Sequence, residues 1–216
     1  MIAVSGVASG VGVTHTAIAI AHVLASHGYR VATVELVQEA TSFERIFSIV
    51  EDCVYPEHSR SSYMNINHVY YAKKPSRAEY MRLLTENYDY VVCDLGTSHS
   101  TYLQEEFMRA DLAILVAPAA EWRREDVLRF VRSSPPMLER EWHCVVPFAT
   151  SAITGQMQRE LSHAVHAIPI CEDPFDPEDS MKQAVASLHE QWLLPRRKLH
   201  TSITAWLHRR KGKGEG

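Results

Sequence analysis

The stretch Ala3–Ala21, AVSGVASGVGVTHTAIAIA, decides the fold class of this chain. The short apolar run Ile2–Gly6 predicts a strand, and a glycine-rich turn follows it. The next residues, THTAIAIAHVLASHG, have helical character and end at Gly28, as a helix with a C-terminal glycine does. A strand, a glycine-rich turn and a helix in this order are typical of a loop whose backbone N–H groups wrap a phosphate.

Length and composition are those of one globular domain. The chain has 216 residues, 46% of them hydrophobic and 22% charged, and a net charge of −4. This charge argues against a nucleic-acid-binding surface spread over the whole molecule, and no specific nucleic-acid site is evident. The first basic residue is Arg30, so no signal peptide is expected, and no apolar stretch is long enough to span a bilayer. We expect a cytoplasmic protein.

The cysteines give little sign of a metal or disulfide site. Cys53, Cys93, Cys144 and Cys171 are widely separated and form no CxxC pair. Cys93 and Cys144 lie in apolar runs and are predicted to be small buried side chains in a reducing compartment.

Apolar strand-like runs alternate with helical patterns along the chain, which predicts an α/β fold with a doubly wound, mainly parallel sheet covered on both faces. Residues 1–195 are predicted to form this domain, and residues 196–216 a basic amphipathic tail. The strands are expected in YRVATVEL (29–36), NINHVYYA (65–72), YDYVVCDLG (88–96), DLAILVAP (111–118), WHCVVPFA (142–149) and AIPI (167–170). Helices are expected in SFERIFSIV (42–50), SRAEYMRLLTEN (76–87), YLQEEFMRA (102–110), REDVLRFVRSS (124–134) and GQMQRELSHAV (155–165).

Two details sharpen this expectation. Ser76 and Glu79 have the spacing of a capping box. The core strands should lie side by side and parallel, with buried residues Ile2, Val4, Val31, Val34, Val91, Val92, Leu112, Ile114, Val116, Val145 and Val146.

The glycine-rich loop is a candidate nucleotide site that lacks the usual lysine. Thr14 stands where a magnesium-binding hydroxyl belongs, and Asp94 ends a later apolar strand, so these two are the candidate magnesium ligands. The residues predicted to contact the nucleotide are Gly6, Ser9, Gly10, Val11, Gly12, Val13, Thr14 and His15. His15 could donate a proton to a phosphate, although an ordinary histidine is mostly neutral at pH 7, and a plain helix-start residue is the alternative.

Four segments together resemble the MinD/ParA family of deviant Walker ATPases: residues 5–36, YDYVVCDLGT (88–97), ADLAILVAPAAEWRREDVLRFV (110–131) and AIPICEDPF (167–175), the last being similar to the family's late loop near the base. The resemblance covers Ile2 to Leu188. It implies a P-loop fold, ATP or ADP with Mg²⁺ as ligand, and the segment Thr97–Phe107 as a switch and dimer face. An ordinary loop and helix is the alternative for that segment.

The chain departs from the family at the residues that carry the chemistry. The signature lysine falls on Ala8 and the Walker lysine on Val13, while the aspartate that helps to position water falls on Val37. The asparagine that contacts the base falls near Pro147. Each lost lysine weakens nucleotide binding roughly ten- to a hundredfold, and phosphoryl transfer depends on such cations. No catalytic residue is assigned; Asp94 would serve if the chain were active.

The C-terminal residues 196–216 combine apolar and basic side chains. Leu199, Ile203, Trp206 and Leu207 share one helical face and are flanked by lysines and arginines. Such a helix can lie on an anionic membrane, or its apolar face can dock on the domain.

The resemblance therefore favours a degenerate member, TadZ/CpaE-like or BcsQ-like, with weak or no ATP hydrolysis. It would act as a localisation or assembly factor for a membrane-associated pilus or secretion machine, with protein partners and as a homodimer. The alternative is a switch ATPase that dimerises on ATP and takes its cations from a partner or second protomer. A small-molecule enzyme of the dethiobiotin-synthetase type ranks below both, because it also needs the loop lysine.

Overall fold

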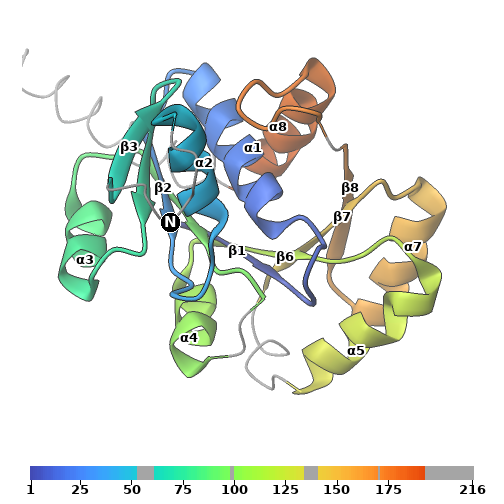
Figure 1. Ribbon diagram of the computed structural model, residues 1–216. Helices are drawn as coiled ribbons and strands as arrows, with labels where there is room; N and C mark the ends of the chain where they lie inside the picture. The colour runs from blue at the N-terminus through green and yellow to red at the C-terminus, as the bar shows by residue number, and fades with distance from the viewer. Residues whose placement is uncertain (53–60, 98–99, 134–140, 170, 193–216) are drawn as a thin grey trace, which may run out of the picture.

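The computed structural model describes residues 1–52, 61–97, 100–133, 141–169 and 171–192. They form an eight-stranded sheet in the order β3-β4-β2-β5-β1-β6-β7-β8, shown in Figure 1. The strands are β1 (Ile2–Gly6), β2 (Val31–Glu35), β3 (Tyr63–Ile66), β4 (Val69–Lys73), β5 (Tyr90–Asp94), β6 (Leu112–Val116), β7 (His143–Pro147) and β8 (Ala164–Ile168).

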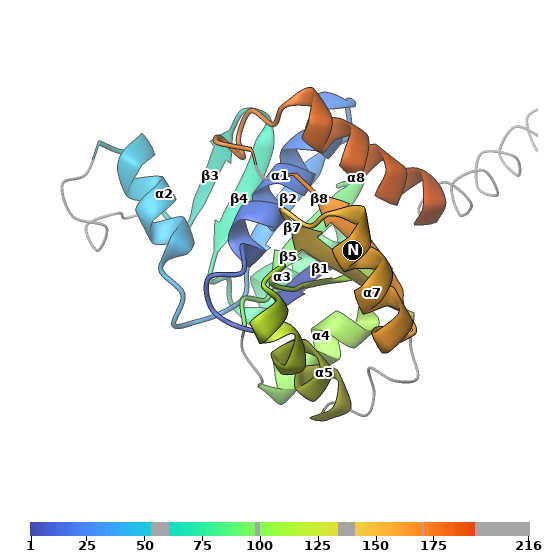
Figure 2. The ribbon, with the colours of Figure 1, turned by 90° about the vertical axis from the view of Figure 1, so that its right-hand side faces the viewer.

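Helices cover both faces of this sheet, as Figures 1 and 2 show. One face carries α1 (Val13–Ser26), α2 (Ser42–Val50) and α8 (Asp179–Trp192), and the other carries α3 (Arg77–Thr85), α4 (Thr101–Arg109), α5 (Arg124–Ser133) and α7 (Ser151–Leu161). A short 3₁₀ turn, Glu121–Arg123, precedes α5. The predicted doubly wound α/β fold is confirmed.

The central strands pair as the apolar runs predict. β1 pairs in parallel with β5 and with β6, and β2 pairs in parallel with β5. All the residues predicted for the core strands are buried. Unbroken apolar strands require cover on both faces, and the two helix layers supply it.

Two predictions were wrong. The helix predicted in GQMQRELSHAV (155–165) ends at Leu161 as α7, and Ala164 and Val165 belong to strand β8. The segment NINHVYYA (65–72) is not a single strand. The structure has an antiparallel hairpin, β3 and β4, with Ile66 paired to Val69. Asn67 and His68 have φ of 46° and 68°, which is the backbone of a two-residue type I′ turn. The usual glycine is absent from this turn, so the sequence signal for the hairpin is weak.

Helices α3 and α8 differ in how far the sequence predicted them. The capping box at the start of α3 is confirmed, because the Ser76 side chain accepts from the Glu79 N–H and Glu79 accepts from the Ser76 N–H. Helix α8 was not predicted as an element. It packs beside α1 through apolar side chains that include Val185 and Leu188.

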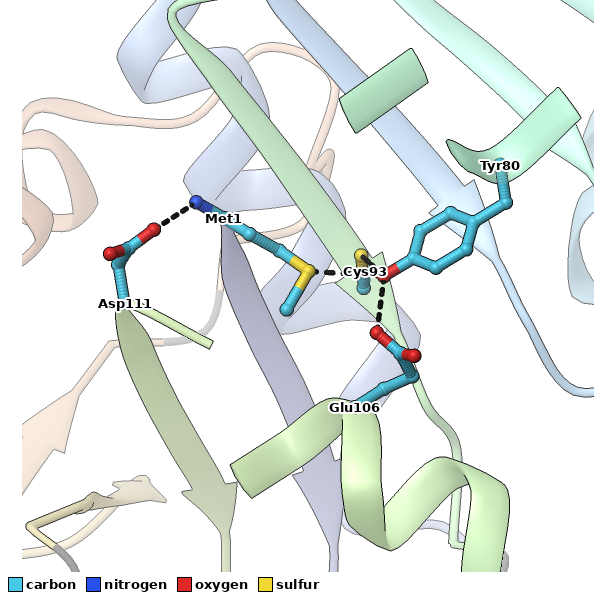
Figure 3. Close-up of polar contacts among 5 residues, drawn as sticks. All are labelled: Met1, Tyr80, Cys93, Glu106 and Asp111. Atoms are coloured by element: carbon cyan, nitrogen blue, oxygen red, sulfur yellow. Dashed lines mark hydrogen bonds and ion pairs between the residues drawn. The ribbon is translucent and has the colours of Figure 1, made fainter. Parts of the chain in front are cut away.

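A buried polar cluster fastens α4 to α3 and to the sheet (Figure 3). The Tyr80 hydroxyl donates to Glu106 Oε2 at 2.8 Å and lies 3.6 Å from Cys93 Sγ. Burial raises the pKa of the Cys93 thiol to about 12, so this cysteine is an inert core residue. Nearby, the Met1 ammonium pairs with Asp111 at 2.8 Å. Helix α4 lies at the end of the segment that follows Asp94. The cluster therefore anchors this end of the segment to α3 and the sheet.

The predictions for the cysteines, the C-terminal tail and membrane-spanning helices are tested in part. Cys93 and Cys144 are buried, as predicted, and Cys171 is buried as well; Cys53 and the tail, residues 196–216, lie outside the described residues. Within the described ranges, no helix is long and apolar enough to cross a membrane.

Candidate functional site

The glycine-rich loop lies at the carboxyl end of β1, between the carboxyl ends of β5 and β6. Gly10 and Gly12 have φ of 76° and 95°, values that only glycine adopts without strain. Gly12 is the N-cap residue of α1, and no side chain caps this helix. The backbone N–H groups from Ala8 to His15 donate no hydrogen bond to any residue that the structure describes. The loop is therefore rich in free donors and open to an anion.

Two valines of the loop point back into the core. A Cβ added at Gly6 would lie 2.4 Å from Val13 Cγ2 and 2.8 Å from Val11 Cγ2. Only glycine fits beneath these methyl groups, and Val13 is 6% exposed. The position of the Walker lysine is thus filled by an apolar side chain that packs on the end of β1 instead of reaching a phosphate.

Asp94 ends β5 beside this loop and is 3% exposed. Its Oδ1 accepts from the Gly96 N–H at 2.9 Å, and the Gly96 carbonyl in turn accepts from the Gly6 N–H at 2.9 Å. Burial raises the pKa of the Asp94 carboxyl, while hydrogen bonds from the Thr14 hydroxyl and Gly96 N–H act in the opposite direction. Thr14 and Asp94, predicted from their motifs, are therefore brought together.

Glu35 is a second buried carboxyl that the sequence analysis did not assign to the site. It ends β2 and is the register partner of Asp94 on β5. Its side chain is 0% exposed, and Oε1 accepts from the Phe43 N–H at 3.1 Å while Oε2 has no hydrogen-bond partner among the described residues. Burial, opposed by the Phe43 hydrogen bond, raises the pKa of Glu35 to about 7, and the charge of Asp94 adds to the rise.

The residues at and around the positions that depart from the nucleotide-hydrolysing pattern supply no charge to the site. Val37 packs against the segment after β5, because a Cβ at Gly96 would lie 2.9 Å from Val37 Cγ2. His15 lies 3.6 Å from Cys171 Sγ, and burial lowers the pKa of its imidazole. A neutral His15 adds no positive charge to the loop at pH 7.

The donor set fits a phosphate and a magnesium ion in part. Mg²⁺ is held in proteins by one or two carboxylates, a hydroxyl, water and substrate phosphate. Asp94, Glu35 and Thr14 supply such oxygens, and the unpartnered Oε2 of Glu35 is a buried acceptor that lacks a donor. In the described residues no group of three or more His, Cys, Asp or Glu side chains could hold a metal by itself. A magnesium ion here would therefore depend on the phosphate and water.

Exposed aromatic side chains stand along the same edge of the sheet. Trp122, after β6, is 83% exposed, and Phe148, after β7, is 73% exposed. Phe148 has a φ of 60°, an uncommon value for a bulky residue and one that costs on the order of 1 kcal/mol or more. It follows Pro147, where the resemblance places the contact to the base. The other predicted residues, Ser9 and Gly10, form the exposed tip of the loop.

The segment Thr97–Phe107 is described except for residues 98 and 99. It begins beside the loop, since Thr97 Cγ2 would lie 3.3 Å from a Cβ at Gly6. Its helix α4 is capped by the Ser100 side chain, which accepts from the Leu103 N–H. The segment therefore connects the candidate nucleotide site to α4.

Comparison with known proteins was made by sequence and by structure. No protein-family model matches the sequence, and no curated protein matches it. Structures of the same fold include a MinC:MinD cell division protein complex from Aquifex aeolicus, with a TM-score of 0.61, 17% identity and coverage of 85% of this chain and 91% of that one. A putative plasmid partition protein from Borrelia burgdorferi bound to AMPPNP has a TM-score of 0.58 and 19% identity over 90% of this chain and 98% of that one.

A third similar structure is a biosynthetic enzyme. Cobyrinic acid a,c-diamide synthase from Mycobacterium smegmatis, solved with an ATP analog and magnesium, has a TM-score of 0.61 and 13% identity over 88% of this chain and 95% of that one. A ParA-family ATPase from Chlorobium tepidum has a TM-score of 0.59 and 11% identity over 86% and 95% of the two chains. With these neighbours, and with its loop at the carboxyl end of β1, the chain has the fold of MinD, ParA-family ATPases and related P-loop NTPases.

Proposed function

We propose that this protein binds ATP or ADP with Mg²⁺ weakly, hydrolyses it little or not at all, and serves as a nucleotide-dependent localisation or assembly factor. The observation that carries the proposal is the row of backbone N–H groups from Ala8 to His15, none of which donates to a described residue. They stand at the N-terminus of α1, which has no acidic residue in its first turn and no side-chain cap. Such donors favour a phosphate.

The loop carries no side-chain cation, which supports the proposal that the protein hydrolyses ATP little or not at all. Val13 is packed against β1, Ala8 carries no charge, and burial keeps His15 neutral at pH 7. Val37 stands in place of the carboxylate that would orient water. Phosphoryl transfer needs both a cation at the developing charge and a positioned nucleophile. This loop can therefore hold a phosphate more readily than it can cleave one.

The first experiment measures ATP binding and turnover by the full chain with Mg²⁺. We expect weak binding, near the millimolar range because two charge-assisted contacts are missing. Binding should fall at least tenfold in Thr14→Ala and Asp94→Ala and stay unchanged in Thr154→Ala, a control at a half-buried threonine on α7. Hydrolysis by the wild type should equal that of the Thr14→Ala, Asp94→Ala double variant. Steady hydrolysis that this double variant loses would instead favour the switch ATPase with cations from a partner or second protomer.

The membrane-associated role rests on the composition of residues 196–216. This segment carries Trp206 and Leu207 between basic clusters, which suits an anionic membrane surface. The protein partner, the homodimer and the pilus or secretion machine belong to the same proposal and rest on the family resemblance. For the homodimer, the candidate face is the segment Thr97–Phe107, which begins at the loop.

Deleting residues 199–216 tests the membrane contact. If the tail is a tether, the shortened chain should lose sedimentation with phosphatidylserine vesicles and keep its melting temperature within a few degrees. Vesicles of phosphatidylcholine alone are the control, because the basic side chains need anionic lipid. If the apolar face docks on the domain instead, each large side chain removed should cost about 1.5–3 kcal/mol of stability. A large fall in the melting temperature would argue against the tether.

A further inference from the structure

A cavity of about 700 Å³ lies at the opposite edge of the sheet from the glycine-rich loop. It is bounded by the end of α1, the start of β2, the β3–β4 turn and the segment before α8. These elements meet at the amino ends of the strands, whereas the loop and Asp94 stand at the carboxyl ends. The volume is within the range of small-molecule sites, about 300–1,000 Å³. Neither the glycine-rich loop nor the proposed nucleotide switch uses this cavity.

The lining of the cavity includes two neighbouring tyrosine rings, tilted relative to each other, and an arginine. The ring centroids of Tyr70 and Tyr88 are 5.9 Å apart with the planes 30° from parallel. The Arg30 guanidinium carbon lies 5.7 Å from the centroid of the Tyr88 ring. An arginine on an aromatic face keeps its N–H edges for an anion.

The guanidinium of Arg30 is available. Its backbone N–H donates to Asp89 at 2.9 Å, but the guanidinium itself forms no ion pair or hydrogen bond with a residue in the described ranges. Lys182, on the first turns of α8, adds a second cation to the lining and pairs with exposed Asp179 at 3.4 Å. The lining therefore combines two cations, Arg30 and Lys182, with one carboxylate, Asp176, beside the tyrosine rings.

Next to the tyrosines, the β3–β4 hairpin adds carboxamide groups that can hydrogen-bond the edge of a polar ring, since Asn65 is the register partner of Tyr70. Asn65 and Asn67 belong to the lining, and Asn67 Nδ2 lies 3.5 Å from the Phe175 carbonyl, which brings the hairpin turn against the segment before α8. The left-handed backbone of Asn67 and His68 holds that turn in one geometry. Carboxamides both donate and accept, as the edge of a nucleobase does.

We propose that this cavity binds a nucleotide, with the base against Tyr70 and Tyr88 and the phosphate on Arg30. Two features of the lining, a pair of neighbouring tyrosine rings and the Arg30 guanidinium, match the two halves of such a ligand. The proposal is independent of nucleotide binding at the glycine-rich loop.

The probe for this cavity is AMP, which lacks the β- and γ-phosphates that a P-loop holds. Saturation-transfer NMR on the full chain should detect contact at the AMP ring protons, and titration should saturate. Adenosine and ribose 5-phosphate, which carry only one half each, should bind at least tenfold more weakly. If either half binds as tightly as AMP, the proposed two-part recognition is wrong.

Two variants and two controls locate the binding. Arg30→Gln should weaken AMP binding at least tenfold, because it removes one charge-assisted contact, and Tyr88→Leu should weaken it through loss of the ring. Arg132→Gln, an exposed arginine on α5, should change nothing. Thr14→Ala should leave AMP binding unchanged.

Absence of saturable AMP binding, or binding that survives Arg30→Gln in a chain with native circular dichroism, would overturn the proposal. Binding lost in Thr14→Ala and kept in Arg30→Gln would place AMP at the loop and overturn it too.

Discussion

Glu35→Gln is expected to raise the free energy of unfolding by about 3.5 kcal/mol at pH 8 in a buffer without divalent cations, because one pKa unit corresponds to about 1.4 kcal/mol. The folded-state pKa of Glu35 is raised to about 7, while an unfolded glutamate titrates near 4.3. Below pH 4 the carboxyl is protonated in both states and costs nothing. As the pH rises from about 4 to about 7, only the unfolded chain ionises, so Glu35 progressively lowers the stability of the fold, and above pH 7 the loss stays constant. Glutamine is uncharged at every pH, like the protonated carboxyl, so the variant does not lose this free energy of unfolding.

The measurement is urea unfolding of the wild type and Glu35→Gln at pH 5 and at pH 8. The difference between the two proteins should be small at pH 5 and should reach its full value at pH 8. Glu39→Gln, which changes an exposed carboxyl on the same loop, should alter stability little at either pH. A Glu35→Gln variant that is less stable than wild type at pH 8 would show that the ionised carboxylate is stabilised in the fold.

Val13→Lys is expected to tighten ATP binding by tenfold or more without producing hydrolysis. The lysine supplies one charge-assisted contact to a phosphate, worth about 1.5–3 kcal/mol. It also removes an apolar side chain from between Gly6 and the core, so the melting temperature should fall while affinity rises. If affinity rises while stability falls, the gain in affinity comes from a contact between the lysine and ATP. A general effect on the fold would not change the two in opposite directions.

Val13→Met is the matched control, because it has similar length and no charge. ATP affinity should rise in Val13→Lys only. Turnover should stay absent because Val37 leaves the water without its carboxylate, and two groups that act on one transition state are not additive. Val37→Asp alone should not restore it, since the new carboxylate would stand against Gly96 near buried Asp94 and Glu35. Hydrolysis by Val13→Lys alone would show that another residue already positions the water.

The sequence could predict the parts of the molecule that depend on neighbours in the chain. The apolar runs predicted the parallel strands, since a strand covered on both faces has no polar side to reveal. The glycine pattern predicted the loop after β1, and Ser76 with Glu79 predicted the start of α3, because a turn and a cap are local structures. Even the hairpin at Asn67 and His68 is local, but its turn lacks glycine, so the pattern resembled one strand.

Tertiary structure decided what depends on strand order. Glu35 and Asp94 are far apart in sequence, and only the β2–β5 pairing makes them register partners with shifted pKa values. The inward packing of Val13 onto Gly6 follows from the path of the loop, which no residue pattern specifies. The cavity beside Arg30 arises where four separate segments meet. Sequence determined the fold and the phosphate loop because their causes are local and periodic; the charges and the second cavity come from long-range contacts, which only the folded chain brings together.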